Sequence, residues 1–209
     1  MSIQIYIFLF SLIMISILFV SILATFKVTK KDFSDKIKLD VAVEQMRESE
    51  NTIRLFLNRN AVEAGASIDK IAKLLNIKQG GVEQGIQGQA CLREDNFTGE
   101  KIVTFKEGLS EIEKKFIYAH EIAHILNGDT IPAMRPIGYN KPQVEQLADY
   151  TAAALLLPLD SVFDFLMENN YKESSARKKV LLVHQLCKRY EVTEMIVLRR
   201  IKEVFAIKS

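Results

Sequence analysis

Two histidines and a glutamate stand at a spacing that can bind a metal ion and use it in catalysis. His120 and His124 are four residues apart, so on a helix both imidazoles project from one face and can bind the same ion. Glu121 lies beside them, where it can reach a metal-bound water without being a ligand. This H-E-x-x-H pattern predicts a zinc hydrolase. The alternative is that the two histidines merely share a helix face.

The residues around this pattern predict the helix that it needs. Ser110 and Glu113 have the spacing of a capping box, in which each residue satisfies the other's backbone N–H group. Asn127 and Gly128 favour a helix end, because glycine tolerates the left-handed conformation found there. Between these limits apolar residues recur every three or four positions and predict one buried stripe, made of Ile112, Phe116, Ala119, Ala123 and Leu126.

A catalytic zinc ion needs a third protein ligand, for which Glu145 is the strongest candidate. It begins a second helical stretch, which Pro158 ends. Asp149 shares its face and is placed to accept a hydrogen bond from the outer nitrogen of a ligating histidine, which would fix the orientation of that ring. Two alternatives stay open at this point. Glu145 could be a solvated glutamate favoured by the helix dipole, and Asp129 is its nearest competitor as a ligand.

The motifs FIYAHEIAH at 116–124 and EQLADYTAAALLLP at 145–158 together resemble those of the ImmA/IrrE family of zinc metallopeptidases. The resemblance covers roughly residues 67–201. It implies that His120, His124 and Glu145 bind Zn²⁺ and that Glu121 is the catalytic base. Ala123 stands where the family more often has glycine, and Thr151 where it usually has phenylalanine; neither substitution touches the inferred chemistry.

The N-terminal residues 1–26 contain no charge and are almost entirely apolar from residue 3 onward. About 20 apolar residues suffice to cross a bilayer as a helix, so this segment predicts a single transmembrane anchor with residues 3–26 in the lipid. A cleaved signal peptide would have a basic start and a shorter apolar stretch. Lys27, Lys30 and Lys31 follow the span and none precedes it, which predicts a cytoplasmic catalytic domain.

The rest of the chain predicts a juxtamembrane linker at 27–39 and one metallopeptidase domain at 40–209. Its 28 basic and 26 acidic residues give a net charge of +2, which demands no polyanionic partner, so nucleic acid is not expected to bind. Cys91 and Cys187 are too few for a secreted disulfide framework. Arg177-Lys178-Lys179 and Arg199-Arg200 are interpreted as solvated helix faces.

The pattern of the remaining segments predicts an α+β fold, mainly helical and zincin-like, with a small antiparallel sheet. A turn at 96–99 joins the two expected strands, and an edge strand of such a sheet could bind a substrate peptide by pairing with it. Glycines at 80, 81, 85 and 88 indicate a non-helical region before them. The expected strands are 89–93 and 101–105, and the further helices are 40–64, 68–75, 160–168, 174–189 and 193–205.

Several residues have alternative interpretations. The last two helices resemble a helix-turn-helix in outline and could bind DNA or a repressor, although completion of the catalytic core is the simpler interpretation. His184 is expected to be structural. Tyr118, Tyr139 and Tyr150 are candidates for polarising a substrate carbonyl, and the sequence does not separate them.

Together these patterns predict a membrane-anchored zinc endopeptidase in which Glu121 takes a proton from water and passes it to the leaving amine. The family resemblance suggests site-specific cleavage of a cytoplasmic regulator such as a helix-turn-helix repressor. A regulatory protein that binds zinc without proteolysis is one alternative, although it would have no use for Glu121. A quality-control peptidase of broad specificity is another.

Overall fold

The computed structural model describes residues 36, 38–84, 89–95, 97–129 and 141–208, and the residues from Val43 onward form one compact unit. The expected transmembrane span at 1–26 and nearly all of the linker at 27–39 lie outside the described residues. Among the described residues, no single helix is long and apolar enough to cross a bilayer. Two consecutive helical segments, Gln143–Leu156 and Leu159–Glu168, are long and apolar enough only when taken together, and the chain bends by 65° between them.

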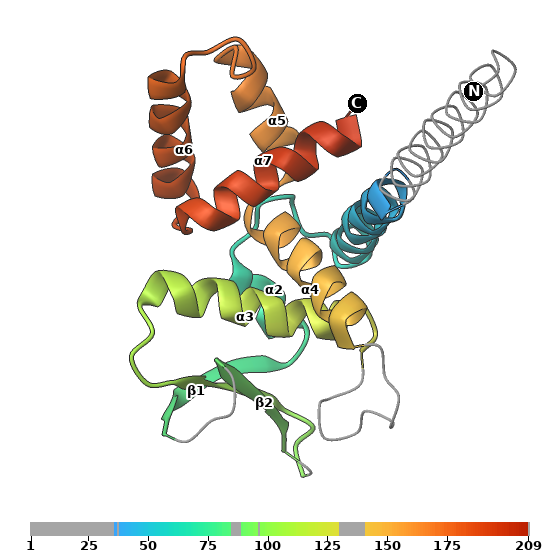
Figure 1. Ribbon diagram of the computed structural model, residues 1–209. Coiled ribbons are helices and arrows are strands. Elements are labelled where there is room, and N and C mark those ends of the chain that lie inside the picture. The colour runs from blue at the N-terminus through green and yellow to red at the C-terminus, as the bar shows by residue number, and fades with distance from the viewer. Residues whose placement is uncertain (1–35, 37, 85–88, 96, 130–140, 209) are drawn as a thin grey trace, which may run out of the picture. The chain divides into compact units, whose positions relative to one another are not determined.

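The described chain is mainly helical with one small sheet, as Figure 1 shows. Helix α3 lies between the sheet and α4, and α7 contacts α4, α5 and α6. A first helix covers residues 38–59. The other elements are α2 (Ile68–Leu74), β1 (Ile77–Glu83), β2 (Ala90–Glu94), β3 (Lys101–Lys106), α3 (Glu111–Leu126), α4 (Lys141–Leu156), α5 (Leu159–Glu168), α6 (Ala176–Tyr190) and α7 (Glu194–Lys208).

The sheet has three strands in the order β1-β3-β2 and is mixed, so the expectation of a purely antiparallel sheet was wrong. Strands β2 and β3 pair antiparallel, with Leu92 opposite Val103, as expected for the two strands read from the sequence. Strand β1 was missed, and it pairs parallel to β3 with Ile77 opposite Lys101. Both β1 and β2 are therefore edge strands.

Gly80, one of the glycines that suggested an irregular region, allows β1 to approach β3 closely. A Cβ atom on Gly80 would lie 2.8 Å from Cγ2 of Ile102 and 2.9 Å from Cγ2 of Thr104. The pairing register shifts between Gln79 and Val82, which marks a bulge at the two glycines. Glycine inside a strand often marks a place where another part of the chain comes close. Gly80 and Gly81 therefore belong to strand β1 of the sheet, and not to an irregular region before the sheet as expected.

Helix α3 begins and ends as its flanking residues predict. The Ser110 side chain accepts from the Glu113 backbone at 3.3 Å, and Glu113 accepts from the Ser110 backbone at 2.8 Å, which completes the capping box. At the other end Asn127 is the C-cap residue and Gly128 follows with a φ of +78°. The local signals therefore place the helix that carries both histidines to within a residue or two.

The buried surface of α3 is wider than the single stripe expected. Ala119 and Ala123 are fully buried, but Ile112 in the first turn is 43% exposed. Tyr118 and Ile122 are also buried, because α3 is covered by the sheet on one side and by α4 on the other. The facing residues of α4 are small and fully buried, namely Ala148, Ala152 and Ala153. Alanines on both helices allow the backbones to come close, which brings their functional side chains within reach of one another.

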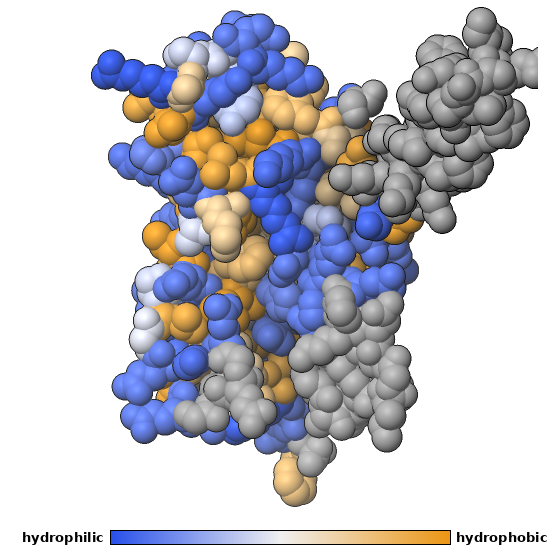
Figure 2. Space-filling view, in the orientation of Figure 1, coloured by the Kyte–Doolittle hydropathy of each residue, from blue (hydrophilic) through white to orange (hydrophobic). Residues whose placement is uncertain are grey.

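The C-terminal helices complete this core, in agreement with the simpler interpretation of them. Helix α7 buries Val197 and Val204 completely, and also buries the charged residues Arg200 and Glu203. In the view of Figure 2, apolar side chains gather on the part of the surface that α5, α6 and α7 form. Exposed apolar residues of α6 and α7 are Val180, Leu181, Met195 and Leu198. The absence of a nucleic-acid partner stays a prediction.

Candidate metal site

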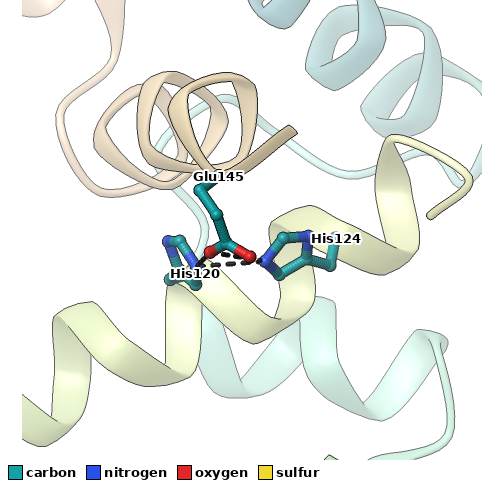
Figure 3. Close-up of side chains that lie close together, drawn as sticks. All are labelled: His120, His124 and Glu145. Carbon is teal, nitrogen blue, oxygen red and sulfur yellow. Dashed lines mark hydrogen bonds and ion pairs between the residues drawn. The ribbon is translucent and has the colours of Figure 1, made fainter. Parts of the chain in front are cut away.

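Three side chains from α3 and the start of α4 converge on one point, as Figure 3 shows. His120 Nε2 lies 3.0 Å from His124 Nε2 and 3.2 Å from Oε2 of Glu145. The distance from His124 Nε2 to the same Glu145 oxygen is 3.5 Å. One ligand atom from each of the three residues thus lies within 4.8 Å of the others. Of the two candidates for a third ligand, the structure brings Glu145 to this point.

A carboxylate holds the outer nitrogen of each histidine. His120 Nδ1 lies 2.8 Å from Oδ1 of Asp149, and His124 Nδ1 lies 2.8 Å from Oδ2 of Asp129. An ionised carboxylate can only accept hydrogen bonds, so each Nδ1 atom must carry the proton. In the neutral imidazoles both Nε2 atoms then present lone pairs toward each other and toward Glu145, an arrangement that a shared cation would stabilise.

The donor set fits a divalent metal ion. Two imidazole nitrogens and one carboxylate oxygen, with a fourth position left for water or substrate, are the ligands typical of catalytic zinc. Donors about 2.0–2.1 Å from a tetrahedral zinc lie roughly 3.3 Å apart. The observed separations of 3.0, 3.2 and 3.5 Å fall on both sides of that value. Within the part of the chain that the structure describes, this is the group that could hold a metal.

The site is partly shielded from water, and both this burial and the surrounding charges change the pKa of His120. Burial lowers the pKa of His120, but its hydrogen bond to Asp149 and the negative charges around it outweigh burial and raise that pKa above its usual value. The charges that contribute belong to Asp149, Glu121 and Glu145. A metal ligand must be deprotonated, so binding of a cation at this site competes with a proton on His120.

Glu121 lies on α3 directly after His120 and is half-buried. Its charge raises the pKa of His120, which shows that the carboxylate acts on the site electrostatically. The side chain of His124 is 6% exposed, whereas that of Glu145 is 35% exposed. The site is therefore closed on the His124 side and open near Glu145, where a water molecule or a substrate could enter.

Other sequence candidates lie elsewhere or act differently. Asp129, the expected rival of Glu145, contacts the outer nitrogen of His124 instead of the point where the ligands converge. The Tyr118 hydroxyl is buried and donates to the Ile77 carbonyl at 3.3 Å, so it cannot reach a substrate at the metal site. Tyr150 accepts a hydrogen bond of 2.8 Å from Gln146, and Tyr139 is outside the described residues. His184 lies outside the group of possible metal ligands and is exposed on α6, so its expected structural role stays a prediction.

Arg199 is the residue near the site that the sequence did not reveal. Its Nη1 atom donates to Oδ2 of Asp149 at 2.8 Å, although the two residues are 50 positions apart. The adjacent Arg200 is buried and donates to the Leu157 carbonyl at 2.8 Å. The interpretation of Arg199-Arg200 as a solvated cluster was therefore wrong. The one available signal was Glu203, an acid four positions after Arg199 and within its reach on a helix.

The fold and the site together define a metallopeptidase type of architecture, in which an H-E-x-x-H helix and a glutamate from the next helix form a metal-binding group. The chain belongs to the IrrE N-terminal-like domain family, peptidase family M78, whose family model matches residues 87–202. That match covers more than half of the 209 residues.

Comparison with solved structures finds a transcriptional regulator from Mycobacterium tuberculosis with 17% sequence identity and a TM-score of 0.49. The match covers 75% of this chain and 46% of that one, so this chain spans about half the length of that regulator. Comparison with curated proteins gives no match.

Proposed function

We propose that this protein is a zinc-dependent endopeptidase. The observation that carries the proposal is the convergence of His120 Nε2, His124 Nε2 and the Glu145 carboxylate, with the outer nitrogen of each ring on a carboxylate. Ring orientation by such carboxylates is a common property of zinc sites. Membership of a peptidase family supports the reaction type.

The residues of the chain have distinct roles in this proposal. A zinc ion held by the three ligands would polarise a peptide carbonyl and lower the pKa of water toward about 7. Glu121 would accept the proton of the attacking water and return it to the leaving nitrogen. Asp149 and Asp129 would keep the histidine rings in the orientation and tautomer that binding requires. The open side near Glu145 would admit the substrate.

The substrate would be a protein. Within the part of the chain that the structure describes, both β1 and β2 lie at the edges of the sheet, and an extended peptide can pair with such an edge. The family resemblance favours a cytoplasmic regulator, such as a helix-turn-helix repressor, as the particular substrate. The uncharged segment 3–26 supports attachment to the membrane, with the catalytic domain on the cytoplasmic side.

The test compares cells that produce the wild-type chain with cells that produce Glu121→Gln. Glu111→Gln is the matched control, because Glu111 is an exposed acid on the same helix and forms an ion pair with Lys114 three residues away. We expect a protein fragment that forms with the wild type and with Glu111→Gln but not with Glu121→Gln, while the zinc content of all three purified proteins stays equal. Cleavage retained by Glu121→Gln would contradict the role given to this residue.

The fragments also separate the alternatives. One or a few defined products would support site-specific cleavage of a regulator. Degradation of many unfolded proteins would support a quality-control peptidase. If no fragment forms and zinc is bound in every variant, the protein acts by binding and the endopeptidase proposal is wrong.

A further inference from the structure

We propose that Arg199 of α7 is a positioning residue of the metal site, which holds Asp149 so that His120 presents Nε2 to the ion. The inference rests on the proposed function, since it deepens the role of the same site. It assigns part of the site to a helix that carries neither a metal ligand nor the proposed base.

Asp149 uses both of its oxygens to join two side chains. Oδ1 lies 2.8 Å from His120 Nδ1, and Oδ2 accepts from Arg199 Nη1 at 2.8 Å. A carboxylate held at one oxygen can still swing about its side-chain bonds, but one held at both is fixed. Arg199 therefore sets the direction from which Asp149 meets the imidazole, and through it the direction of Nε2.

Arg199 is itself held in place on two sides. Its Nε atom donates to Oε1 of Glu203 at 2.9 Å, and its guanidinium carbon lies 4.8 Å from the centre of the Tyr150 ring. The Glu203 side chain is 2% exposed and also accepts from Arg200 at 3.3 Å. The planar guanidinium of Arg199 binds Asp149 and Glu203 through separate nitrogens in a fixed geometry, which the flexible ammonium group of a lysine does not provide.

The need to attach α7 to α4 does not by itself explain why Arg199 binds Asp149. Arg200 already makes that attachment, because it donates to the Leu157 carbonyl at the end of α4 and also binds Glu50 on the first helix. Arg199 instead reaches toward the metal site and binds Asp149, the carboxylate that holds His120 Nδ1. Arg199 is thus placed to orient the site, whereas the adjacent Arg200 attaches α7 to α4.

The charge of Arg199 suits the same role, because its guanidinium is always positive and meets the Asp149 carboxylate across a hydrogen bond of 2.8 Å. For His124 the corresponding carboxylate comes from nearby in the chain, because Asp129 lies five residues after it.

The experiment measures zinc affinity by competition with a chelator in four forms of the full-length protein: wild type, Arg199→Gln, Arg199→Lys and Lys202→Gln. Lys202 is the matched control, because it is an exposed cation on α7 that donates to none of the residues that the structure describes. We expect Arg199→Gln to weaken zinc binding roughly 10- to 100-fold, as is typical of residues that orient a ligand. Arg199→Lys should fall between this variant and the wild type, and Lys202→Gln should bind like the wild type.

A second readout reports the ring itself. In the zinc-loaded wild type, nuclear magnetic resonance should show the His120 Nδ1 proton protected from exchange with water by its bond to Asp149. Arg199→Gln should exchange this proton faster, whereas the corresponding proton of His124 should be unaffected. A residue that only stabilised the fold would change both histidines alike.

Each outcome decides the matter. Wild-type affinity in Arg199→Gln, or an equal loss in Lys202→Gln, overturns the inference. If Arg199→Gln does not fold, the comparison passes to Arg199→Lys, where wild-type affinity together with an unchanged His120 proton overturns it. Failure of the wild type to bind zinc overturns the proposed function, and the inference with it, and is distinguished from the other outcomes because it occurs without any substitution.

Discussion

The Nε2 atoms of His120 and His124 lie 3.0 Å apart, while the Nδ1 atom of each ring lies 2.8 Å from a carboxylate. When both rings are neutral, the two inner nitrogens therefore face each other as hydrogen-bond acceptors. The Glu145 carboxylate adds a third acceptor at the same point. Either a proton on His120, whose pKa is raised, or a metal ion relieves the repulsion among these acceptors, so a metal ion should stabilise the fold as well as complete the site.

The first prediction follows from that repulsion. Zinc at about 100 times its dissociation constant should stabilise the folded state by about 2.7 kcal/mol, which corresponds to a rise in Tm of roughly 5–10 °C. His124→Ala should remove most of this rise, because it leaves only two ligands. Thermal unfolding with and without zinc measures the effect. A wild-type Tm that does not respond to zinc would contradict the assignment of the site.

Glu145→Gln tests the third ligand. The amide removes the charge while keeping the shape of the side chain, so zinc affinity should fall by more than about 100-fold, the upper range for residues that merely orient a ligand. Glu168→Gln is a suitable control, because Glu168 is an exposed acid at the end of α5. If both variants bind zinc as the wild type does, Glu145 is a solvated residue that lies near the histidines by chance.

Asp129→Asn separates the two roles that this residue could have. As the partner of His124 Nδ1, it should affect zinc affinity by roughly 10- to 100-fold, since the amide can still accept a weaker hydrogen bond. As a direct ligand, it should cost at least as much affinity as Glu145→Gln. The comparison of the two dissociation constants under the same conditions decides between these roles, with Asp164→Asn on the exposed face of α5 as control.

The grouping of His120, His124 and Glu145 could be predicted from the sequence because the signals for it are local. The spacing of His120 and His124, the capping box at Ser110 and the glycine at 128 all act within one helix. The Glu145 helix could be joined to it because small residues such as Ala148 allow close packing. These patterns depend on neighbours in the chain, and the structure places the corresponding side chains together.

What the sequence did not predict depends on contacts between distant segments. Strand β1 was missed because Gly80 and Gly81 weaken its strand pattern, and only its partner β3 shows why a side chain is not tolerated at Gly80. Arg199 looked like part of a solvated charge cluster because its partner Asp149 is 50 residues away. An ion pair between distant segments has no periodic signature, so in the sequence Arg199 and Asp149 look like ordinary surface residues.

Tyr118→Phe tests whether the buried hydroxyl contributes to catalysis. The hydroxyl donates to the Ile77 carbonyl between α3 and β1, so its loss should lower the free energy of unfolding by about 1 kcal/mol. It should change kcat/KM less than about twofold, because the group does not reach the metal site. A loss of kcat of about 100-fold or more would show instead that Tyr118 stabilises the transition state.

The raised pKa of Tyr118 also predicts how the stability of the fold changes with pH. Burial, with a smaller contribution from the charge of Asp69, raises the pKa of Tyr118 from 10.0 to about 12. Between these values the unfolded chain loses the phenolic proton while the folded chain keeps it, so stability should fall as the pH rises from 10 to 12. Chemical unfolding at several pH values should show this fall in the wild type and a smaller one in Tyr118→Phe.

Arg200→Leu should be strongly destabilising. The Arg200 side chain is 2% exposed and its removal leaves the Leu157 carbonyl without this donor and the buried Glu203 with one cation fewer. Breaking a buried ion pair in this way costs about 3–5 kcal/mol. Arg177→Leu, at an exposed position on α6, should change the free energy of unfolding by less than about 0.5 kcal/mol. Denaturant unfolding of both variants measures the difference.

The link between Asp149 and Arg199 also orders events in time. During synthesis, the segments that contain His120, His124 and Glu145 leave the ribosome before α7 has been made. Asp149 therefore lacks its second partner, Arg199, until 50 further residues have been added. If Arg199 orients the site as proposed, a nascent chain would hold zinc weakly and gain its full affinity only when α7 docks. Proteolytic activity would then be confined to molecules whose folding is complete, and a chain cut before α7 would lose its metal as well as its fold.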